Sequence, residues 1–301
     1  MFIYKAHGLI LRSEFRLPHA LPAPESDGEI VEIKAGMRPV SAGAKQLCEG
    51  MSGTRDEVHF RIPDVAAFCC VQGREIWVAP EAAVSPIKLE LFTLGTALGI
   101  IHFQRGDFPI HGAFVSDGDR AFGLCGASGE GKSTIGLALS RAGCSMLTDD
   151  VGVIRIAGEV AQVFAENTHV KLWADTAENF KLKTDSDERI DGRLSKFYVP
   201  VPTQSRSPPP RLDALVILGS GPAESEPRFE RIEALAALSH LREHTYRPFL
   251  ISALGLDQAH LRFSAELLSK VRMYRFTRPR SITRVQEGAD LLMRQLVHGS
   301  A

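Results

Sequence analysis

Short apolar runs, separated by breaks that contain proline or glycine, alternate through the first 84 residues. β-forming residues dominate several of these runs, at positions 2–4, 9–11 and 29–33. Two further runs, at 67–71 and 75–78, flank the dipeptide Gln72-Gly73 and predict a hairpin. The pattern therefore predicts a β-rich N-terminal region over residues 1–84, in which we find no motif with recognisable chemistry.

From residue 85 onward, apolar residues recur three and four positions apart, which is the period of a helix. Ser85 and Pro86 form a favourable helix start, and the apolar stripe runs to an end near Arg105 and Gly106. Predicted strands at 110–115, 120–125, 145–148 and 212–218 then alternate with predicted helices at 134–142, 172–180, 257–271 and 285–296. This alternation predicts an α/β fold. We expect a second domain over residues 85–301, with a mainly helical C-terminal part.

The most specific signal is the sequence Gly-Ala-Ser-Gly-Glu-Gly-Lys-Ser-Thr, which has the form G-x-x-x-x-G-K-[ST]. Its members are Gly126, Ala127, Ser128, Gly129, Glu130, Gly131, Lys132, Ser133 and Thr134. Glycines let the backbone curl so that N–H groups point at phosphate oxygens. Lys132 adds a charge for the β and γ phosphates, and Ser133 offers a hydroxyl ligand to Mg²⁺. Because a predicted strand precedes this loop and a predicted helix follows it, we expect nucleotide binding; the alternative is a glycine-rich turn.

Two aspartates and a histidine are expected at the same end of the sheet as this loop. Asp149 and Asp150 lie 17 and 18 residues beyond Lys132, directly after the predicted strand 145–148. If that strand runs parallel to the strand before the loop, one carboxylate can hold Mg²⁺ and the other can accept a proton from an attacking hydroxyl. His111 precedes Lys132 by 21 residues, at the start of another predicted strand. The alternative is that the acids cap a turn and His111 is structural.

His111-Gly112, the loop and Asp149-Asp150 together resemble the catalytic core of the HPr kinase/phosphorylase family, over about residues 108–156. The resemblance implies a P-loop kinase core similar to that of HPr kinase and phosphoenolpyruvate carboxykinase. It implies transfer of phosphate from ATP, with Mg²⁺, to a serine hydroxyl of a peptide or small protein. It also implies roles for five residues: Asp149 as base, His111 as its helper, Lys132 on the phosphates, and Ser133 with Asp150 at Mg²⁺.

The chain also departs from that family. Thr134 follows the loop serine where HPr kinases carry an acid, and we find no counterpart of their downstream signature region, which is linked to phosphorolysis. The layout is more similar to the shorter HPr-kinase-like proteins of bacterial gene clusters, which include kinases for the C-terminal serine of lasso-peptide precursors. The segments 171–175 and 244–248 are weaker likenesses to that group.

Composition narrows the class of partner and location. The net charge of −1 gives no electrostatic reason to expect binding to nucleic acid or to an anionic membrane. No secretion signal is apparent, and no run approaches the roughly 20 apolar residues that span a bilayer. The five cysteines form no metal-ligand pattern, so we expect reduced thiols and a cytoplasmic protein. The sequence leaves open whether the chain forms a homo-oligomer.

Other residues have both a plain and a functional interpretation. A basic run without acids consists of Lys270, Arg272, Arg275, Arg278, Arg280 and Arg284. It predicts either a solvated face or a docking patch for an acidic peptide. The highly charged stretch 184–196 predicts a loop, and Trp77 and Trp173 are expected to be core anchors.

Three other functions are compatible with a phosphate loop. A kinase for a small-molecule alcohol would use the same core chemistry, and an ATP-binding regulator would keep the loop without turnover. A transporter ATPase is disfavoured because the chain lacks an L-S-G-G-Q-type segment. The main hypothesis remains a serine kinase.

Overall fold

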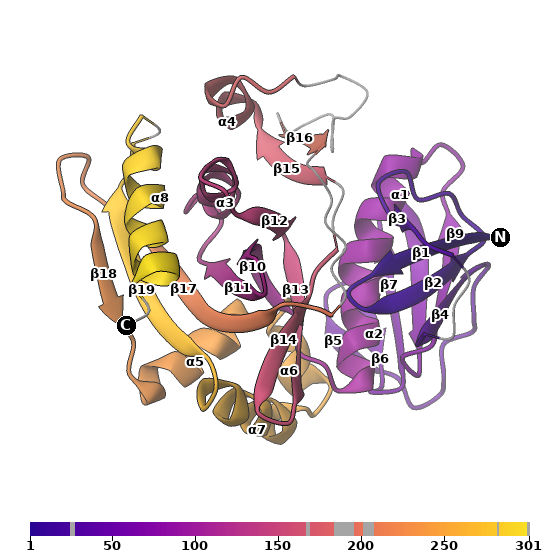
Figure 1. Cartoon of the computed structure of the whole chain (residues 1–301). Coiled ribbons are helices and arrows are strands. Elements are labelled where there is room, and N and C mark those ends of the chain that lie inside the picture. Colours follow the sequence, from indigo (N-terminus) through magenta and orange to yellow (C-terminus); the bar gives the residue numbers. More distant parts are fainter. Residues whose placement is uncertain (25–27, 167–168, 184–195, 201–207, 282, 300–301) are drawn as a thin grey trace. The chain divides into compact units, whose positions relative to one another are not determined.

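The computed structural model describes the chain apart from residues 25–27, 167–168, 184–195, 201–207, 282 and 300–301 (Figure 1). Most of the predicted charged loop therefore lies outside the described residues. Internal contacts divide the chain into two compact units: Met1–Pro109 with Tyr246–His260, and Ile110–Thr245 with Leu261–Ala301. Large sheets underlie both units, and the protein is a mixed α/β structure. The division between the units falls after Pro109 rather than at the predicted boundary after residue 84.

The first unit is built on a nine-stranded sheet in the order β3-β1-β2-β4-β9-β8-β7-β6-β5. The strands are β1 (Phe2–Ala6), β2 (Leu9–Ser13), β3 (Leu21–Pro22), β4 (Ile30–Ala35), β5 (Lys45–Cys48), β6 (Met51–Gly53), β7 (Glu57–Ile62), β8 (Ala66–Val71) and β9 (Glu75–Pro80). Neighbours are antiparallel except for the pairs β2–β4 and β4–β9. The predicted hairpin is present, with Gln72 and Gly73 at positive φ in its turn.

A continuous helical segment follows these strands and belongs to the same unit. It consists of α1 (Pro86–Phe92), η1 (Thr93–Ala97) and α2 (Leu98–Arg105). Ser85 caps its start by accepting a hydrogen bond from the Lys88 N–H, and Gly106 ends it in the left-handed conformation. The predicted start and end are therefore confirmed. The helix joins the N-terminal unit because α2 packs its apolar face on β8 and β9.

This helical segment is longer than the apolar runs expected from the sequence, so it bears on the expectation that the chain does not span a membrane. Pro86–Arg105 has 20 residues and is long and apolar enough, by length and composition, to cross a membrane. However, 61% of the apolar window is buried inside the protein. Burial of this extent is typical of a core helix that packs on a sheet.

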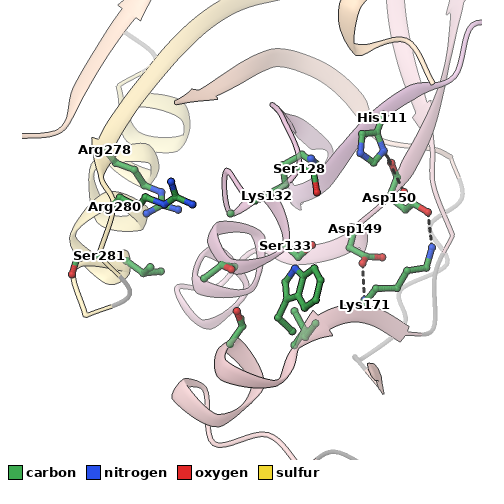
Figure 2. A pocket seen from close by; sticks show the side chains of 17 residues that line it. His111, Ser128, Lys132, Ser133, Asp149, Asp150, Lys171, Arg278, Arg280 and Ser281 are labelled. Carbon is green, nitrogen blue, oxygen red and sulfur yellow. Dashed lines mark hydrogen bonds and ion pairs between the residues drawn. The ribbon is translucent and has the colours of Figure 1, made fainter. Parts of the chain in front are cut away.

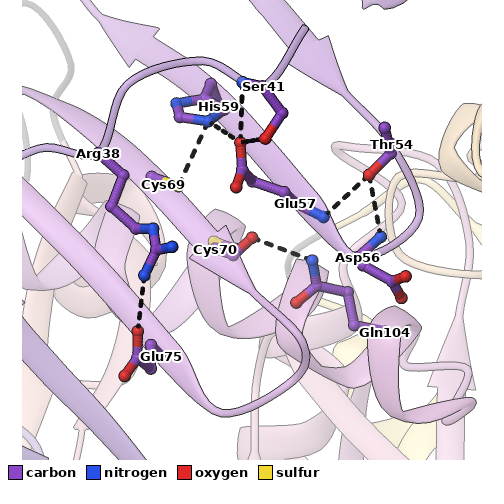
Figure 3. A network of polar contacts seen from close by, with 10 residues as sticks. All are labelled: Arg38, Ser41, Thr54, Asp56, Glu57, His59, Cys69, Cys70, Glu75 and Gln104. Carbon is purple, nitrogen blue, oxygen red and sulfur yellow. Dashed lines mark hydrogen bonds and ion pairs between the residues drawn. The ribbon is translucent and has the colours of Figure 1, made fainter. Parts of the chain in front are cut away.

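A polar network lies on one face of β7 and β8 (Figure 3). His59 pairs with Cys69 across these strands, and Glu57 lies two residues before His59, so the three side chains share a face. Glu57 Oε1 accepts hydrogen bonds from the Ser41 N–H and hydroxyl and lies 2.7 Å from His59 Nε2. These contacts, with Ser41 first, lower the pKa of Glu57, whereas burial raises the pKa of the Cys69 thiol to about 12. The Glu57 carboxylate is thus hydrogen-bonded, and the Cys69 thiol stays protonated at neutral pH. Through Glu57, the network connects Ser41 to the sheet.

The second unit is built on an eight-stranded mixed sheet with the path β11-β10-β13-β14-β17-β19-β18, in which β12 pairs with β10 and β11 also pairs with β17. The strands are β10 (Ile110–Asp117), β11 (Arg120–Cys125), β12 (Ser145–Thr148), β13 (Val151–Ala157), β14 (Val160–Phe164), β17 (Arg211–Gly221), β18 (Arg228–Arg231) and β19 (Arg272–Pro279). A separate pair consists of β15 (His169–Trp173) and β16 (Lys196–Pro200).

Helices pack on both faces of the second unit's sheet (Figure 1). Among the described residues, the helices after Pro109 are α3 (Lys132–Arg141), α4 (Ala174–Asn179), α5 (Ala234–His244), α6 (Phe249–Ala253), α7 (Asp257–Leu268), α8 (Val285–Met293) and η3 (Arg294–His298). Helix α6 belongs to the first unit. α3 and α8 share a core with Phe276 on one face, and α5 and α7 share a core with Leu215 on the other. The sheet is therefore covered on both sides, as an α/β architecture requires.

Strand β19 corrects the prediction of a mainly helical C-terminal part. It pairs parallel with β17 and antiparallel with β18, and thus lies inside the sheet. Three arginines among its eight residues hide the apolar pattern, although Met273 and Phe276 are both buried. The terminal helix predicted at 285–296 is present as α8 and η3.

Strand directions bring several segments of the chain to one edge of this sheet. β11, β17 and β19 are parallel, so their C-terminal ends lie at the same edge. β12 runs in the direction of β11 because both are antiparallel to β10, which lies between them. The C-terminal end of β12 and the N-terminal end of β10 therefore reach this edge too.

Candidate functional site

The loop with the G-x-x-x-x-G-K-[ST] sequence connects the end of β11 to the start of α3. Two of its glycines are required by the backbone. Gly131 precedes α3 at a φ of 82°, and at Gly126, with a φ of 151°, an added Cβ would lie 3.0 Å from the Leu218 carbonyl oxygen. The buried Lys132 ammonium donates hydrogen bonds to the carbonyl oxygens of Gly126, at 2.8 Å, and Ala127, at 3.2 Å. The loop therefore closes around the Lys132 ammonium group.

Sheet register places His111 beside the loop and beside the aspartates. Gly112 pairs with Cys125, and its N–H donates to the Asp150 carbonyl at 2.9 Å. His111 Nδ1 lies 2.9 Å from that carbonyl oxygen and 3.2 Å from Asp150 Oδ1. A side chain at Gly112 would not fit, because its Cβ would lie 2.8 Å from the Leu124 carbonyl oxygen. These contacts connect His111 to Asp150.

Lys171, on strand β15, contacts both aspartates. Its backbone N–H donates to Asp149 Oδ2 at 2.6 Å, and its ammonium lies 2.5 Å from Asp150 Oδ2. Burial opposes the charged form of both partners in the ion pair, but their attraction is stronger. The attraction between Lys171 and Asp150 holds the pKa of Asp150 well below its ordinary value, with help from His111, and raises the pKa of Lys171. Asp150 is therefore anionic and Lys171 cationic throughout the neutral range.

One cavity of about 530 Å³ brings the loop, the aspartates and the histidine together (Figure 2). The predicted site residues that line it are His111, Ser128, Gly129, Gly131, Lys132, Ser133, Thr134, Asp149 and Asp150. Three other predicted residues of the loop, Gly126, Ala127 and Glu130, do not line the cavity. The carbonyls of the first two accept hydrogen bonds from Lys132, and the Glu130 carboxylate accepts one from the Ser220 hydroxyl at 2.6 Å. The aspartates thus face the same cavity as the loop lysine.

The cavity also contains residues to which the sequence did not assign a place in the site. Lys171, Arg278 and Arg280 line it, as does Trp173. Trp173 is 43% exposed, so its expected place in the core is wrong. Lys171 and Trp173 lie in the segment 171–175. The weak family resemblance of this segment was the sequence signal that could have placed them in the site. Arg278 comes from β19, and only the parallel register of β17 and β19 shows that it reaches this edge.

Strand β19 also divides the basic run that was predicted as a face or patch. Arg278 is buried at the loop, whereas Arg275 is exposed and lies 3.1 Å from His240 Nε2. Beyond the ends of the strand, Lys270 pairs with Glu159 and Arg284 with Glu287. Because side chains alternate along a strand, Arg275 and Arg278 lie on opposite faces of β19, and the run does not form a single face.

The oxygen donors on the cavity fit Mg²⁺. Ser133 lies in the first turn of α3, and the carboxylates of Asp149 and Asp150 line the same space. Mg²⁺ prefers a few hard oxygen ligands of this kind and keeps several waters. Because Lys171 already holds one oxygen of Asp150, we expect that carboxylate to reach the ion through water.

Replacing Gly131 by Ala should damage the loop more than the same change at Gly129. Both residues have positive φ, which costs alanine about 1–2 kcal/mol, but only at Gly131 would the new Cβ overlap an Arg278 side-chain nitrogen. We therefore expect a larger fall in the free energy of unfolding for Gly131→Ala, measured by urea denaturation. Equal losses in the two variants would show that the Arg278 guanidinium moves aside without measurable cost and is not held rigidly against the loop.

Replacing Lys171 by Met should destabilise the protein by about 1–3 kcal/mol at neutral pH, because Asp150 loses its ammonium partner. The folded-state pKa of Asp150 is depressed, so its contribution is present above the unfolded-state value and lost as pH falls through the folded-state value. The loss should therefore shrink in urea titrations repeated toward acidic pH. Lys270→Met is the control, since its partner Glu159 is 96% exposed and the pair contributes little. A pH-independent loss would contradict the assignment.

Comparisons with known proteins add little to this geometry. No protein-family model matches the chain, and no curated protein matches it. Among solved structures, the HPr(Ser) kinase/phosphatase from Coxiella burnetii is similar, with a TM-score of 0.30 and 11% sequence identity. The match covers 64% of this chain and 93% of that one. The structural similarity is distant, and it establishes neither a family nor a function for this chain.

Proposed function

We propose that the protein is an ATP- and Mg²⁺-dependent kinase that transfers the γ-phosphate to a serine hydroxyl of a peptide or small protein. The observation that carries this proposal is the single cavity lined by Lys132, Ser133, Asp149, Asp150 and His111. Phosphoryl transfer needs a cradle for the phosphates, positive charge, a site for Mg²⁺ and a group that orients the acceptor. The residues of this cavity can supply all four.

The loop side of the cavity would hold the triphosphate. The N–H groups of the loop and the start of α3 can donate to phosphate oxygens, and the helix dipole favours an anion there. On nucleotide binding, the Lys132 ammonium would exchange the Gly126 and Ala127 carbonyls for the β and γ phosphates. Mg²⁺, held by Ser133 and through water by an aspartate, would neutralise part of the phosphate charge.

The acid side would receive the acceptor. In the transfer, the serine oxygen bonds to the γ-phosphorus, the bond from that phosphorus to the β–γ bridging oxygen breaks, and the serine proton passes to a carboxylate. We assign this proton to Asp149, because the Asp150 carboxylate is already paired with the Lys171 ammonium and His111, which lower its pKa. Asp150 then acts as a fixed anion, positioned by Lys171 and His111.

The polypeptide acceptor rests on the sequence motifs, because their order and spacing resemble those of kinases that act on serine. Intact-mass measurement of serine-containing peptides and small carrier proteins, after incubation with the enzyme and Mg-ATP, tests it directly. The expected result is the added mass of one phosphate, located on serine. Transfer to sugars or alcohols but to no polypeptide would establish a small-molecule kinase. ATP binding without transfer to any acceptor would establish a regulator.

A further inference from the structure

The cavity has a cationic end that the proposed chemistry does not use. Arg278 and Arg280 line it at the end of β19, on the other side of Lys132 and Ser133 from Asp150, His111 and Lys171 (Figure 2). The two ends therefore differ in charge: arginines at one, and the carboxylates with their partners at the other. A nucleotide that occupies the loop between them would therefore meet different groups at its two ends.

Arg278 is held against the loop without a carboxylate partner among the described residues. Its side chain donates hydrogen bonds to two carbonyl oxygens, those of Glu130 at 3.2 Å and Pro279 at 3.1 Å. The residue is 8% exposed, and its buried Nε has no hydrogen-bond partner in the described part of the chain. The nearby Glu130 carboxylate is hydrogen-bonded to Ser220. A buried guanidinium in this condition is suited to an anionic ligand.

The electrostatics of this end agree with the geometry. Burial lowers the pKa of Arg278, and the adjacent Arg280 lowers it further, against the attraction of Glu130. Two neighbouring cations repel each other, and a phosphate placed between them and the loop would relieve that repulsion. Gly131 is the loop residue that an added Cβ would drive into Arg278, so the arginine lies at the end of the loop where α3 begins.

We propose that Arg278 holds the α-phosphate of the bound nucleotide, with Arg280 beside it, and so directs the γ-phosphate toward Asp149. The inference rests on the proposed kinase function and adds the direction of the nucleotide to it. The γ-phosphate must lie near the acids for transfer to occur, and the loop between the two ends takes the β-phosphate. The α-phosphate, at the opposite end of the triphosphate, then falls at Arg278.

Nucleotide titration of an Arg278→Met variant tests this direction. ADP and ATP both carry an α-phosphate, so we expect the affinities for Mg-ADP and Mg-ATP to fall by the same factor, about tenfold to a hundredfold. Arg278→Lys keeps a charge and the aliphatic stem, so it should lose less than Arg278→Met. Arg275→Met is the matched control, because Arg275 is exposed on the other face of the same strand. Circular dichroism and thermal melting verify that each variant is folded.

Three results would overturn the inference. Loss of ATP affinity with unchanged ADP affinity would place Arg278 at the γ-phosphate and reverse the nucleotide. Unchanged affinity for both nucleotides, in Arg278→Met or in a folded Arg278→Lys when Arg278→Met does not fold, would show that Arg278 does not contact phosphate. Unchanged affinity would leave the kinase proposal intact, whereas a reversed nucleotide would move the γ-phosphate away from Asp149 and contradict the proposed transfer as well. A wild-type protein that binds neither nucleotide would refute the kinase proposal together with the subsite.

Discussion

Replacing Asp149 by Asn should leave Mg-ATP binding within about threefold of the wild-type value while transfer to the acceptor falls by roughly 10²–10⁴-fold. The amide keeps an oxygen that can still accept the Lys171 N–H, so the local geometry is preserved. It cannot take up the serine proton, however, so only the reaction is lost. Calorimetric titration measures the binding, and the intact-mass assay measures the transfer.

The matched control for this variant is Asp119→Asn. Asp119 is exposed in the turn between β10 and β11, outside the cavity lining. Its replacement should change neither binding nor transfer. If Asp149→Asn turned over at the wild-type rate, the proton would go elsewhere, and Asp150 would be the carboxylate to test next.

Replacing Lys132 by Ala should weaken Mg-ATP binding itself. The loss of a charged hydrogen bond to phosphate corresponds to about 1.5–3 kcal/mol, or roughly a 10- to 150-fold higher dissociation constant. The variant also removes the two hydrogen bonds by which Lys132 closes the loop onto the Gly126 and Ala127 carbonyls. Transfer should fall at least as much as binding, because the lysine neutralises charge in the transition state.

Lys45→Ala serves as the control for this second variant, because Lys45 is an exposed residue of β5 in the first unit. Titration of both variants with Mg-ATP and Mg-ADP gives the comparison, with thermal melting to verify that the proteins are folded. Wild-type affinity in Lys132→Ala would mean that the loop does not hold the β and γ phosphates.

The local part of the site could be predicted because it depends on short stretches of sequence. The loop needs glycine where the backbone turns sharply, and Gly126 and Gly131 have positive φ in the structure. The aspartates follow a strand directly, and His111 begins one, so their place at the sheet edge follows from strand direction. Strand β10, predicted at 110–115, lies between β11 and β12 and is antiparallel to both, so those two strands keep a common direction.

The rest depends on contacts between distant parts of the chain. Lys171 meets the aspartates only because β15 returns to the cavity, 21 residues after Asp150. Arg278 reaches the loop through the register of a strand 146 residues beyond Lys132 in the sequence. Its three arginines hid that strand from the apolar pattern. The helical segment Pro86–Arg105 was predicted in the second domain but belongs to the first unit. Its apolar stripe predicts that one face is buried, but it does not specify which sheet that face covers.

The central claim is that the loop and the aspartates hold one triphosphate between them. A crystal structure of the protein with Mg²⁺ and a non-hydrolysable ATP analogue tests it most directly. The account predicts a γ-phosphate between the Lys132 ammonium and the Asp149 carboxylate, with the α-phosphate at Arg278. A nucleotide bound outside this cavity, or one whose γ-phosphate points away from both aspartates, would contradict it.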